Sequence, residues 1–198
     1  MVQLLKYGNT NTYYVKDGDV GVLVDTDWAG TLPAFFKEIK RQAISIDSIN
    51  YLFVTHYHPD HMGIAGELME LGVQLMVIDG QQDYIHFSDS IFAKDKRVSF
   101  KPIEQEKTLI ISCEESRGFL AQLGVQGEII STPGHSDDSI SLLLDEGIAI
   151  VGDLYPLGAA PAFQDEKINN SWKKILSYGV KKVFYGHAKE GNVEQSIY

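Results

Sequence analysis

The sequence predicts a single mixed α/β domain over residues 1–198. Short apolar runs rich in β-branched and aromatic residues, typical of strands, alternate with segments whose apolar residues recur at helical spacing. A chain of 198 residues is long enough to bury a substantial core and has the usual length of one domain. No repeat, low-complexity segment or linker divides it.

The first half of the chain begins with predicted strands at 2–6 and 11–15, and Asp17-Gly18-Asp19 then provides a hairpin turn into a strand at 20–24. A helix is predicted from Thr31, where a capping hydroxyl precedes an early proline, Pro33. The further elements predicted here are a strand at 51–54, a helix at 63–71, a strand at 73–78 and a short helix at 81–87, with no assigned structure over 88–101.

The second half contains a capping-box pattern, Ser112 to Glu115, which predicts a helix running to Leu123 and ended by Gly124. The other elements predicted in this half are strands at 127–131, 139–144 and 148–151, a helix beginning near residue 165, and a final strand at 181–185.

Three histidines and an aspartate lie within six residues at the junction of a predicted strand and a predicted helix. In extended chain, side chains two residues apart point the same way, so His56 and His58 can bind one metal ion together. Pro59 fixes its own φ and turns the chain, which lets Asp60 and His61 aim at a second position. Four ligand-type side chains seldom gather so closely without a metal, so this pattern predicts a metal site rather than a polar surface turn.

Three more candidate ligands, His135, Asp153 and His187, each follow a glycine at the end of a predicted strand. Glycine lets the backbone bend so that the next side chain points into a shared cleft. Each pattern alone is typical of a surface turn or a cap. Together with the central motif they place five of the six histidines at strand ends, and the sixth, His86, is interpreted as an ordinary helix or loop residue.

The segments THYHPDH, STPGHS, VGDLYP and YGHAKE, in this order, resemble the metallo-β-lactamase superfamily of metal-dependent hydrolases over about residues 20–187. The resemblance is to its small glyoxalase II-like and lactonase-like members. It implies a four-layer αβ/βα sandwich of two mixed β-sheets, with helices on the outer faces and a two-metal centre along one edge of the sheets.

The resemblance also implies a role for each candidate residue. His56, His58 and His135 would hold the first ion, Asp60, His61 and His187 the second, and Asp153 would bridge them. Asp25, at the end of the strand predicted at 20–24, matches the family's aspartate that orients ligand residues from outside the coordination shell.

Imidazole and carboxylate ligands suit zinc, which we expect here, and also iron or manganese. Two such ions can make a metal-bound hydroxide available at neutral pH and stabilise developing negative charge. We hypothesise that Asp60 orients the hydroxide or passes its proton to the leaving group, and that Tyr155 either donates to an oxyanion or packs in the core. The sequence thus predicts hydrolysis of a small ester, thioester, lactone or phosphodiester.

Two other function classes remain open. An iron-dependent oxidoreductase of the mononuclear dioxygenase type is the alternative, because relatives on this fold bind iron through similar ligands. The diiron electron-transfer branch has glutamate where His58 stands, which argues against that branch. A non-catalytic binding module is the third class, and the complete ligand set argues against it. Trp28, Tyr57 and Phe163 are candidates for an apolar pocket rim or for packing.

The amino-acid composition limits the classes of molecule that the protein is expected to bind. The formal net charge is −10 and no Lys/Arg cluster stands out, which argues against nucleic acid and favours a small-molecule substrate. No long apolar run or signal-peptide pattern is present, and the single cysteine, Cys113, fits a reducing compartment and a core position, so a cytoplasmic protein is expected. His61 and Asp153 depart from some β-lactamases of this fold, which argues against antibiotic hydrolysis.

Overall fold

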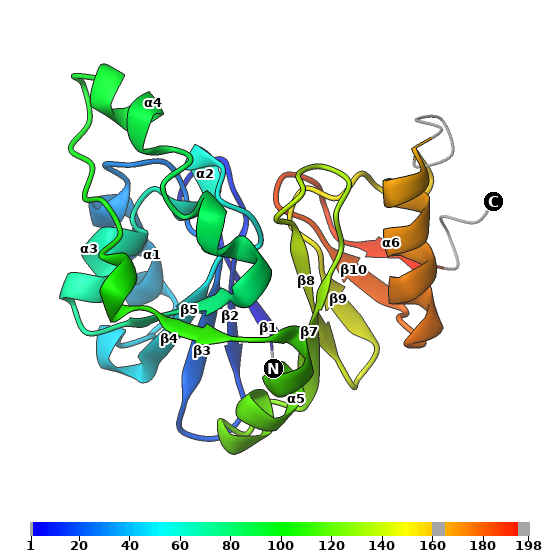
Figure 1. Ribbon diagram of the computed structural model, residues 1–198. Coiled ribbons are helices and arrows are strands. Elements are labelled where there is room, and N and C mark those ends of the chain that lie inside the picture. Colours follow the sequence, from blue (N-terminus) through cyan, green and yellow to red (C-terminus); the bar gives the residue numbers. More distant parts are fainter. Residues whose placement is uncertain (1, 160–164, 194–198) are drawn as a thin grey trace.

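The structure, a computed structural model, describes residues 2–159 and 165–193 and contains two β-sheets that face each other (Figure 1). The first sheet has the order β1 (Val2–Leu5), β2 (Thr12–Lys16), β3 (Gly21–Val24), β4 (Ile49–Phe53), β5 (Gln74–Ile78) and β6 (Leu109–Ile111). Its first three strands pair antiparallel and β3 to β6 pair parallel, so the sheet is mixed.

The second sheet has the order β11 (Gly191–Asn192), β10 (Lys182–Phe184), β9 (Ile148–Ile150), β8 (Ile140–Leu144) and β7 (Gly127–Ser131). It is mixed as well, because β9 and β10 pair parallel while the other neighbours pair antiparallel.

Helices cover the outer faces of both sheets. Figure 1 shows α1 (Leu32–Arg41) and α3 (Ala65–Glu70) outside the first sheet and α6 (Glu166–Ser177) outside the second. The other helices are α2 (Pro59–Met62), α4 (Asp89–Lys94), α5 (Cys113–Gln122) and the 3-10 helices Ile46–Ser48, Asp79–Tyr84 and Gln105–Lys107. No helix in the described part of the chain has the length and apolar content needed to cross a bilayer.

The core has three parts, because neighbouring strand residues point to opposite faces and both faces are buried. Phe53 and Leu142 lie in the cluster between the sheets, whereas the preceding Leu52 packs toward α1 and α3. In the second sheet Leu143 belongs to the cluster beneath α6, with Trp172. The layers therefore run helix, sheet, sheet, helix, which confirms the predicted four-layer fold.

The two sheets are linked at the edge where β3, β4, β9 and β10 end. Asn11 N donates to Gly186 O at 2.7 Å, and Tyr13 Oη donates to Tyr185 O at 2.7 Å. Ile140 N donates to Thr55 O at 2.9 Å. These bonds hold the two sheets beside each other at this end of the sandwich.

Some predicted elements differ from those in the structure, and others were not predicted. The helix predicted at 63–71 is present as α3, which begins at Ala65, and a separate one-turn helix, α2, precedes it. The chain leaves helical geometry at the buried Ile64, next to Gly63, which packs directly on the backbone of Asp27–Ala29. The helix predicted at 81–87 is the 3-10 helix Asp79–Tyr84 followed by turns. The helix α4 and the strands β6 and β11, which were not predicted, contain six, three and two residues.

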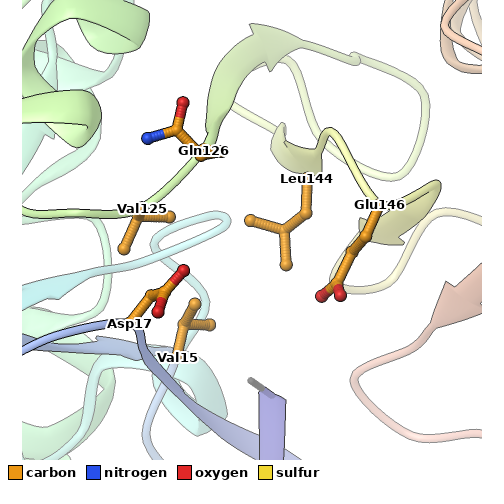
Figure 2. A pocket seen from close by; sticks show the side chains of 6 residues that line it. All are labelled: Val15, Asp17, Val125, Gln126, Leu144 and Glu146. Carbon is orange, nitrogen blue, oxygen red and sulfur yellow. The ribbon is translucent and has the colours of Figure 1, made fainter.

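At the opposite end of the sandwich, the β2–β3 and β8–β9 hairpins meet the turn after α5. A cavity of about 240 Å³ lies there, lined by Val15, Asp17, Val125, Gln126, Leu144 and Glu146 (Figure 2). The ligand-type residues predicted from the sequence follow the other ends of the strands. The candidate site is therefore at the histidine-rich end.

Candidate metal centre

All seven predicted metal ligands come together at one edge of the sandwich. They arise from the loop after β4, from α2, and from the loops after β7, β9 and β10. Their donor atoms form three groups in which every atom lies within 4.8 Å of the others: His56, His58 and His135; His56, His61 and Asp153; Asp60, His61 and His187.

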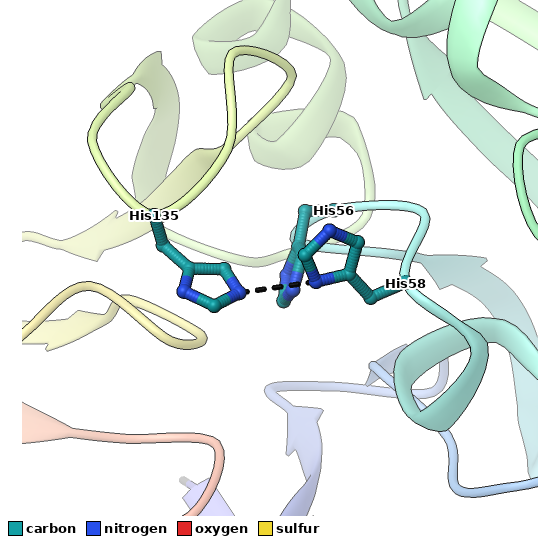
Figure 3. A group of neighbouring side chains, drawn as sticks. All are labelled: His56, His58 and His135. Atoms are coloured by element: carbon teal, nitrogen blue, oxygen red, sulfur yellow. Dashed lines mark hydrogen bonds between the residues drawn. The ribbon is translucent and has the colours of Figure 1, made fainter.

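The first group is formed by three histidine rings that converge (Figure 3). His135 Nε2 lies 3.0 Å from His58 Nδ1, and the ring centroid of His56 lies 4.5 Å from that of His58 and 4.8 Å from that of His135. Two nitrogen ligands of a tetrahedral zinc ion stand about 3.3 Å apart, so this spacing suits a metal. Burial, with the neighbouring histidines, lowers the pKa of His56 well below its ordinary value, which keeps the ring neutral as a ligand must be.

The group formed by Asp60, His61 and His187 lies on and beside α2. His58, just before Pro59, has the extended backbone that a proline imposes on its predecessor, and the helix then begins at Pro59. His187 Nε2 lies 3.0 Å from Asp60 Oδ2. Burial opposes ionisation of Asp60, but His187 and His61 outweigh it and lower the pKa of that carboxyl to about 2. Asp60 is therefore a carboxylate at neutral pH.

Asp153 lies between the group formed by Asp60, His61 and His187 and the group formed by His56, His58 and His135. Its Oδ1 is 3.4 Å from His61 Nε2, and its Oδ2 is 3.4 Å from His187 Nε2 and 3.7 Å from His135 Nε2. Three buried atoms here, Asp153 Oδ1, His61 Nε2 and His56 Nε2, have no hydrogen-bond partner. Buried polar atoms without partners are costly, and a metal ion would satisfy all three. The donor set fits divalent metal ions.

Asp25 orients His61 through the ring nitrogen Nδ1, which is not among the unpaired atoms of the cluster. Its Oδ1 accepts from Thr55 N at 2.6 Å, and its Oδ2 accepts from Thr55 Oγ1 at 2.8 Å and lies 2.9 Å from His61 Nδ1. The backbone of Asp25 has φ 61°, a conformation that a residue other than glycine keeps only where its surroundings fix it. Burial lowers the pKa of His61, but without an ion Asp25 and Asp153 outweigh it and raise that pKa to about 10. Binding of a metal at Nε2 would release this proton, because a ligand imidazole is neutral.

Two of the glycines that precede ligands are required by close packing as well as by bending. Gly152 has φ 57°, and a Cβ there would run into Thr55 Oγ1. A Cβ on Gly186 would lie 2.5 Å from Asp153 Oδ1 and 2.7 Å from His61 Cε1. The strand ends can approach one another this closely only because these positions carry no side chain.

Several residues that hold the ligand loops in place were not predicted from the sequence. Asp138 Oδ2 accepts from Tyr57 N at 2.7 Å, and Gln81 Nε2 donates to Val54 O at 3.1 Å and to Asp138 O at 3.0 Å. Thr10 Oγ1 donates to Asp60 O at 2.7 Å. The one indication of this role in the sequence was the position of Asp138, three residues after His135. Nothing in the sequence around Gln81 or Thr10 indicated that these residues hold the ligand loops.

Tyr155 lies at the candidate site. It lines a cavity of about 210 Å³ together with His135, Asp153 and His187, and its ring centroid is 6.2 Å from that of His135. His86, in contrast, lies 2.9 Å from the carboxylate of Asp89 and belongs to none of the three ligand groups.

The pocket-rim candidates are packing residues where the structure describes them. Tyr57 is 1% exposed within the core beneath α1 and α3, so of its two interpretations the structure favours packing. Trp28 packs edge-on against Phe92, with centroids 5.2 Å apart. Phe163 lies outside the described residues. Cys113 is half-buried at the start of α5 and packs against the cluster between the sheets, as expected for a small core residue.

A sequence profile of the metallo-β-lactamase superfamily matches residues 5–187. The chain belongs to the metallo-β-lactamase superfamily. It is 27% identical over 188 residues to the beta-lactamase-like protein 2 homolog of Drosophila melanogaster, covering 93% of this chain and 59% of that protein. It is 28% identical over 201 residues to the "Probable metallo-hydrolase" of Methanocaldococcus jannaschii, covering 97% and 94%.

An atrochrysone carboxyl ACP thioesterase of Aspergillus fumigatus is 27% identical over 142 residues, covering 69% of this chain and 27% of that protein. The chain thus spans 59% of the length of the insect protein and 27% of the length of this thioesterase. Membership of the superfamily, with metallo-hydrolase and thioesterase relatives, supports a hydrolase in general.

Solved structures of the superfamily share the fold. A metallo-β-lactamase family protein of Thermus thermophilus superposes with a TM-score of 0.73 at 20% identity, covering 98% of this chain and 76% of that one. The B3 metallo-β-lactamase BLEG-1 superposes with a TM-score of 0.72 at 20% identity, covering 100% and 96%.

Proposed function

We propose that this protein is a hydrolase that uses two divalent metal ions, zinc in preference to iron or manganese, to cleave a small ester, thioester, lactone or phosphodiester. The observation that carries the proposal is the position of Asp153, with one carboxylate oxygen toward His61 and the other toward His135 and His187. A carboxylate placed in this way can bridge two ions. The many imidazole donors favour zinc.

In this proposal His56, His58 and His135 hold one ion, and Asp60, His61 and His187 hold the other. When bound, the ions would lower the pKa of a water molecule toward neutrality and stabilise the negative charge that develops on the attacked group. Asp25 holds His61 with Nε2 turned toward Asp153, and Thr55 holds Asp25.

Asp60 is the proposed proton carrier. Asp60 is a carboxylate at neutral pH, and its side chain is 33% exposed, so it reaches the cleft. A carboxylate here can take a proton from water and deliver it to the leaving group. Asp60→Asn should reduce kcat by about 10² to 10⁴, the usual contribution of general acid–base catalysis. Full activity with both ions retained would exclude this role.

An ester or thioester with an apolar acyl group is the favoured substrate within these classes. Phe87 is 56% exposed, the highest value among the exposed large hydrophobic side chains that the structure describes, and its ring centroid lies 5.7 Å from that of His58. An exposed aromatic ring beside a ligand histidine gives the site an apolar wall. The thioesterase named among the relatives supports the same class.

The test is metal quantification of the purified protein combined with turnover assays on chromogenic thioesters, lactones, phosphodiesters and β-lactams. We expect about two zinc or manganese ions per chain and hydrolysis of a thioester or ester. His58→Ala should abolish turnover, and His86→Ala, which alters a histidine outside the ligand groups, should leave it unchanged. One iron per chain with oxygen uptake would overturn the proposal in favour of an oxidoreductase.

A further inference from the structure

Two sets of buried polar residues hold the chain segments that carry the candidate ligands. The first set, which we call the Gln81 clamp, consists of Gln81 and Asp138, which are 1% and 5% exposed. The second set, which we call the Thr10 clamp, consists of Thr10, Asn11 and Asp27, which are 0%, 7% and 3% exposed. None of these five residues belongs to the three ligand groups.

The two clamps act on different ligand groups. We call the group of His56, His58 and His135 the three-histidine site, and the group of Asp60, His61 and His187 the Asp60 site.

The Gln81 clamp joins the end of β4 to the loop after β7. Gln81 Nε2 donates to Val54 O at 3.1 Å and to Asp138 O at 3.0 Å, and Gln81 Oε1 accepts from Ile78 N at 3.3 Å. Asp138 Oδ2 in turn accepts from Tyr57 N at 2.7 Å. The clamp therefore fastens the end of β4 and the residues that follow it to the loop after β7.

These bonds fix the spacing of the three-histidine site. Tyr57 stands between His56 and His58 in the sequence, and Asp138 stands three residues after His135. The bond between Tyr57 and Asp138 thus limits how far the two ligand segments can separate. His58 Nδ1 and His135 Nε2, which these segments carry, lie 3.0 Å apart.

The Thr10 clamp joins α2 to the loop after β10. Thr10 N donates to Asp27 Oδ2 at 3.0 Å, and Thr10 Oγ1 donates to Asp60 O at 2.7 Å. The next residue, Asn11, donates from N to Gly186 O at 2.7 Å and from Nδ2 to Ala188 O at 2.9 Å. The segment between β1 and β2 therefore ties Asp60 to the residues on both sides of His187.

These bonds connect each clamp to the segments of one site. The bonds of the Gln81 clamp reach the segments of the three-histidine site, and those of the Thr10 clamp reach Asp60 and both neighbours of His187. Asp25 differs, because it contacts both Thr55, just before the three-histidine site, and His61. Buried polar networks fix the groups that they connect, since a member left unpaired is costly.

We propose that the Gln81 clamp sets the metal affinity of the three-histidine site and that the Thr10 clamp sets the metal affinity of the Asp60 site. The clamp residues are positioning residues, which act through the ligand side chains. Loss of one clamp should therefore weaken the binding of one ion and leave the other in place. This inference rests on the two-metal centre of the proposed function and adds to it the residues that govern each ion.

The test measures zinc affinity at each site separately. Long-range ¹H–¹⁵N spectra record the ring nitrogens of each histidine, so a zinc titration against a competing chelator gives the two affinities from different rings. His86 belongs to neither site and is the internal reference. Asp138→Ala removes the acceptor of Tyr57 N and should lower the affinity of the three-histidine site about 10- to 100-fold, the usual cost of losing a partner outside the coordination shell. The affinity of the Asp60 site should not change.

Thr10→Val should give the opposite pattern. It keeps the shape of the side chain and removes the hydroxyl that donates to Asp60 O, so the Asp60 site should weaken and the three-histidine site should not. Two variants that keep the hydrogen bonds are the matched controls. Asp138→Asn retains an oxygen for Tyr57 N, Thr10→Ser retains the hydroxyl, and both should bind zinc as the wild type does.

A second variant of each clamp covers the case in which Asp138→Ala or Thr10→Val does not fold. Gln81→Met and Asp27→Ala break the same clamps at another position and should reproduce the same selective losses. Equal losses at both sites, or no loss at the clamp's own site, would overturn the proposal.

The same measurements separate the clamps from the hydrolase function. Selective losses in a protein that binds two ions but turns over no substrate would support the clamps and contradict the hydrolase. Turnover by a two-ion protein whose variants lose both ions equally would contradict the clamps alone. A wild-type protein that binds fewer than two zinc ions would overturn both.

Discussion

Asp25 Oδ2 lies 2.9 Å from Nδ1 of His61, and both side chains are 1% exposed or less. The carboxylate thereby fixes which nitrogen of the ring faces the ligand cluster, since Nδ1 is engaged and Nε2 is left toward Asp153. A histidine that binds a metal commonly donates its other nitrogen to such a carboxylate, which fixes the tautomer and strengthens the ligand.

Asp25→Asn should therefore weaken metal binding without removing a ligand. An amide can offer one oxygen where the carboxylate accepts from both Thr55 and His61. We expect affinity for zinc to fall 10- to 100-fold, the usual cost of losing such a partner. Competition with a chromophoric chelator measures this, and Asp47→Asn on an exposed turn serves as control. Wild-type affinity in Asp25→Asn would show that His61 is oriented by other contacts.

Removal of metal should lower the thermal stability of the protein. Without ions, His56 Nε2, His61 Nε2 and Asp153 Oδ1 are buried without hydrogen-bond partners. A ligand that binds only the folded state stabilises it by about 4 kcal/mol when present at a thousand times its Kd. Calorimetric melting should show a lower Tm in chelator and recovery on adding zinc. An identical Tm in both conditions would contradict a metal site here.

Tyr155→Phe distinguishes the two interpretations of this residue. The ring lies in the cavity with His135, Asp153 and His187, and the substitution keeps the ring while removing the hydroxyl. If the hydroxyl donates to an oxyanion, kcat should fall by about 10² while KM changes little, as when other oxyanion donors are removed. We expect this result from steady-state kinetics. An unchanged kcat would assign Tyr155 to packing.

Glu38 should contribute to the pH dependence of stability. Hydrogen bonds from Arg41, at 2.7 and 2.8 Å, outweigh burial and, with a further bond from Gln42, lower its pKa from 4.5 to about 2. Because the folded state favours the carboxylate, its contribution is complete above pH 4.5 and is lost as the pH falls toward 2.

Glu38→Gln should then reduce the free energy of unfolding at pH 7 by about 1–2 kcal/mol, in the range for a hydrogen-bonded charged group. The difference from wild type should shrink between pH 5 and pH 2 in urea denaturation. Glu70→Gln, at a side chain that is 56% exposed, is the control. A difference that is constant with pH would mean that Glu38 acts through packing alone.

Features that depend on neighbours in the sequence were predictable. The capping box at the start of α5 is present as predicted, with Ser112 N donating to Glu115 Oε2 at 2.8 Å and Glu115 N to Ser112 Oγ at 3.2 Å. The convergence of the seven candidate ligands was also predicted, because each marks the end of a strand or the start of a helix and strand ends share one edge of a sheet.

Features that depend on distant contacts were not predictable. The strand β6 has three residues and exists because it pairs with β5, more than 30 residues earlier. Gln81 bridges Val54 and Asp138, which are 27 and 57 residues away. In the sequence it is one polar residue among several. The start of α3 at Ala65 instead of Gly63 likewise reflects core packing, since 63–71 alone has helical spacing.

The chain after β10 approaches Asp153 and His61 closely at Gly186. A Cβ at Gly186 would press on Asp153 Oδ1 and His61 Cε1, so Gly186→Ala should displace the carboxylate of Asp153 or the loop of His187. Misplacement of about 1 Å at a catalytic centre costs about 10²-fold in rate. Gly118→Ala is a matched control, because its Cβ meets nothing within 4 Å and it lies inside α5, where alanine is the better helix former. We expect Gly186→Ala to lose metal affinity and turnover, and Gly118→Ala to keep both with a Tm at or above that of wild type. Full turnover in Gly186→Ala would show that the loops after β9 and β10 can separate without disturbing the centre.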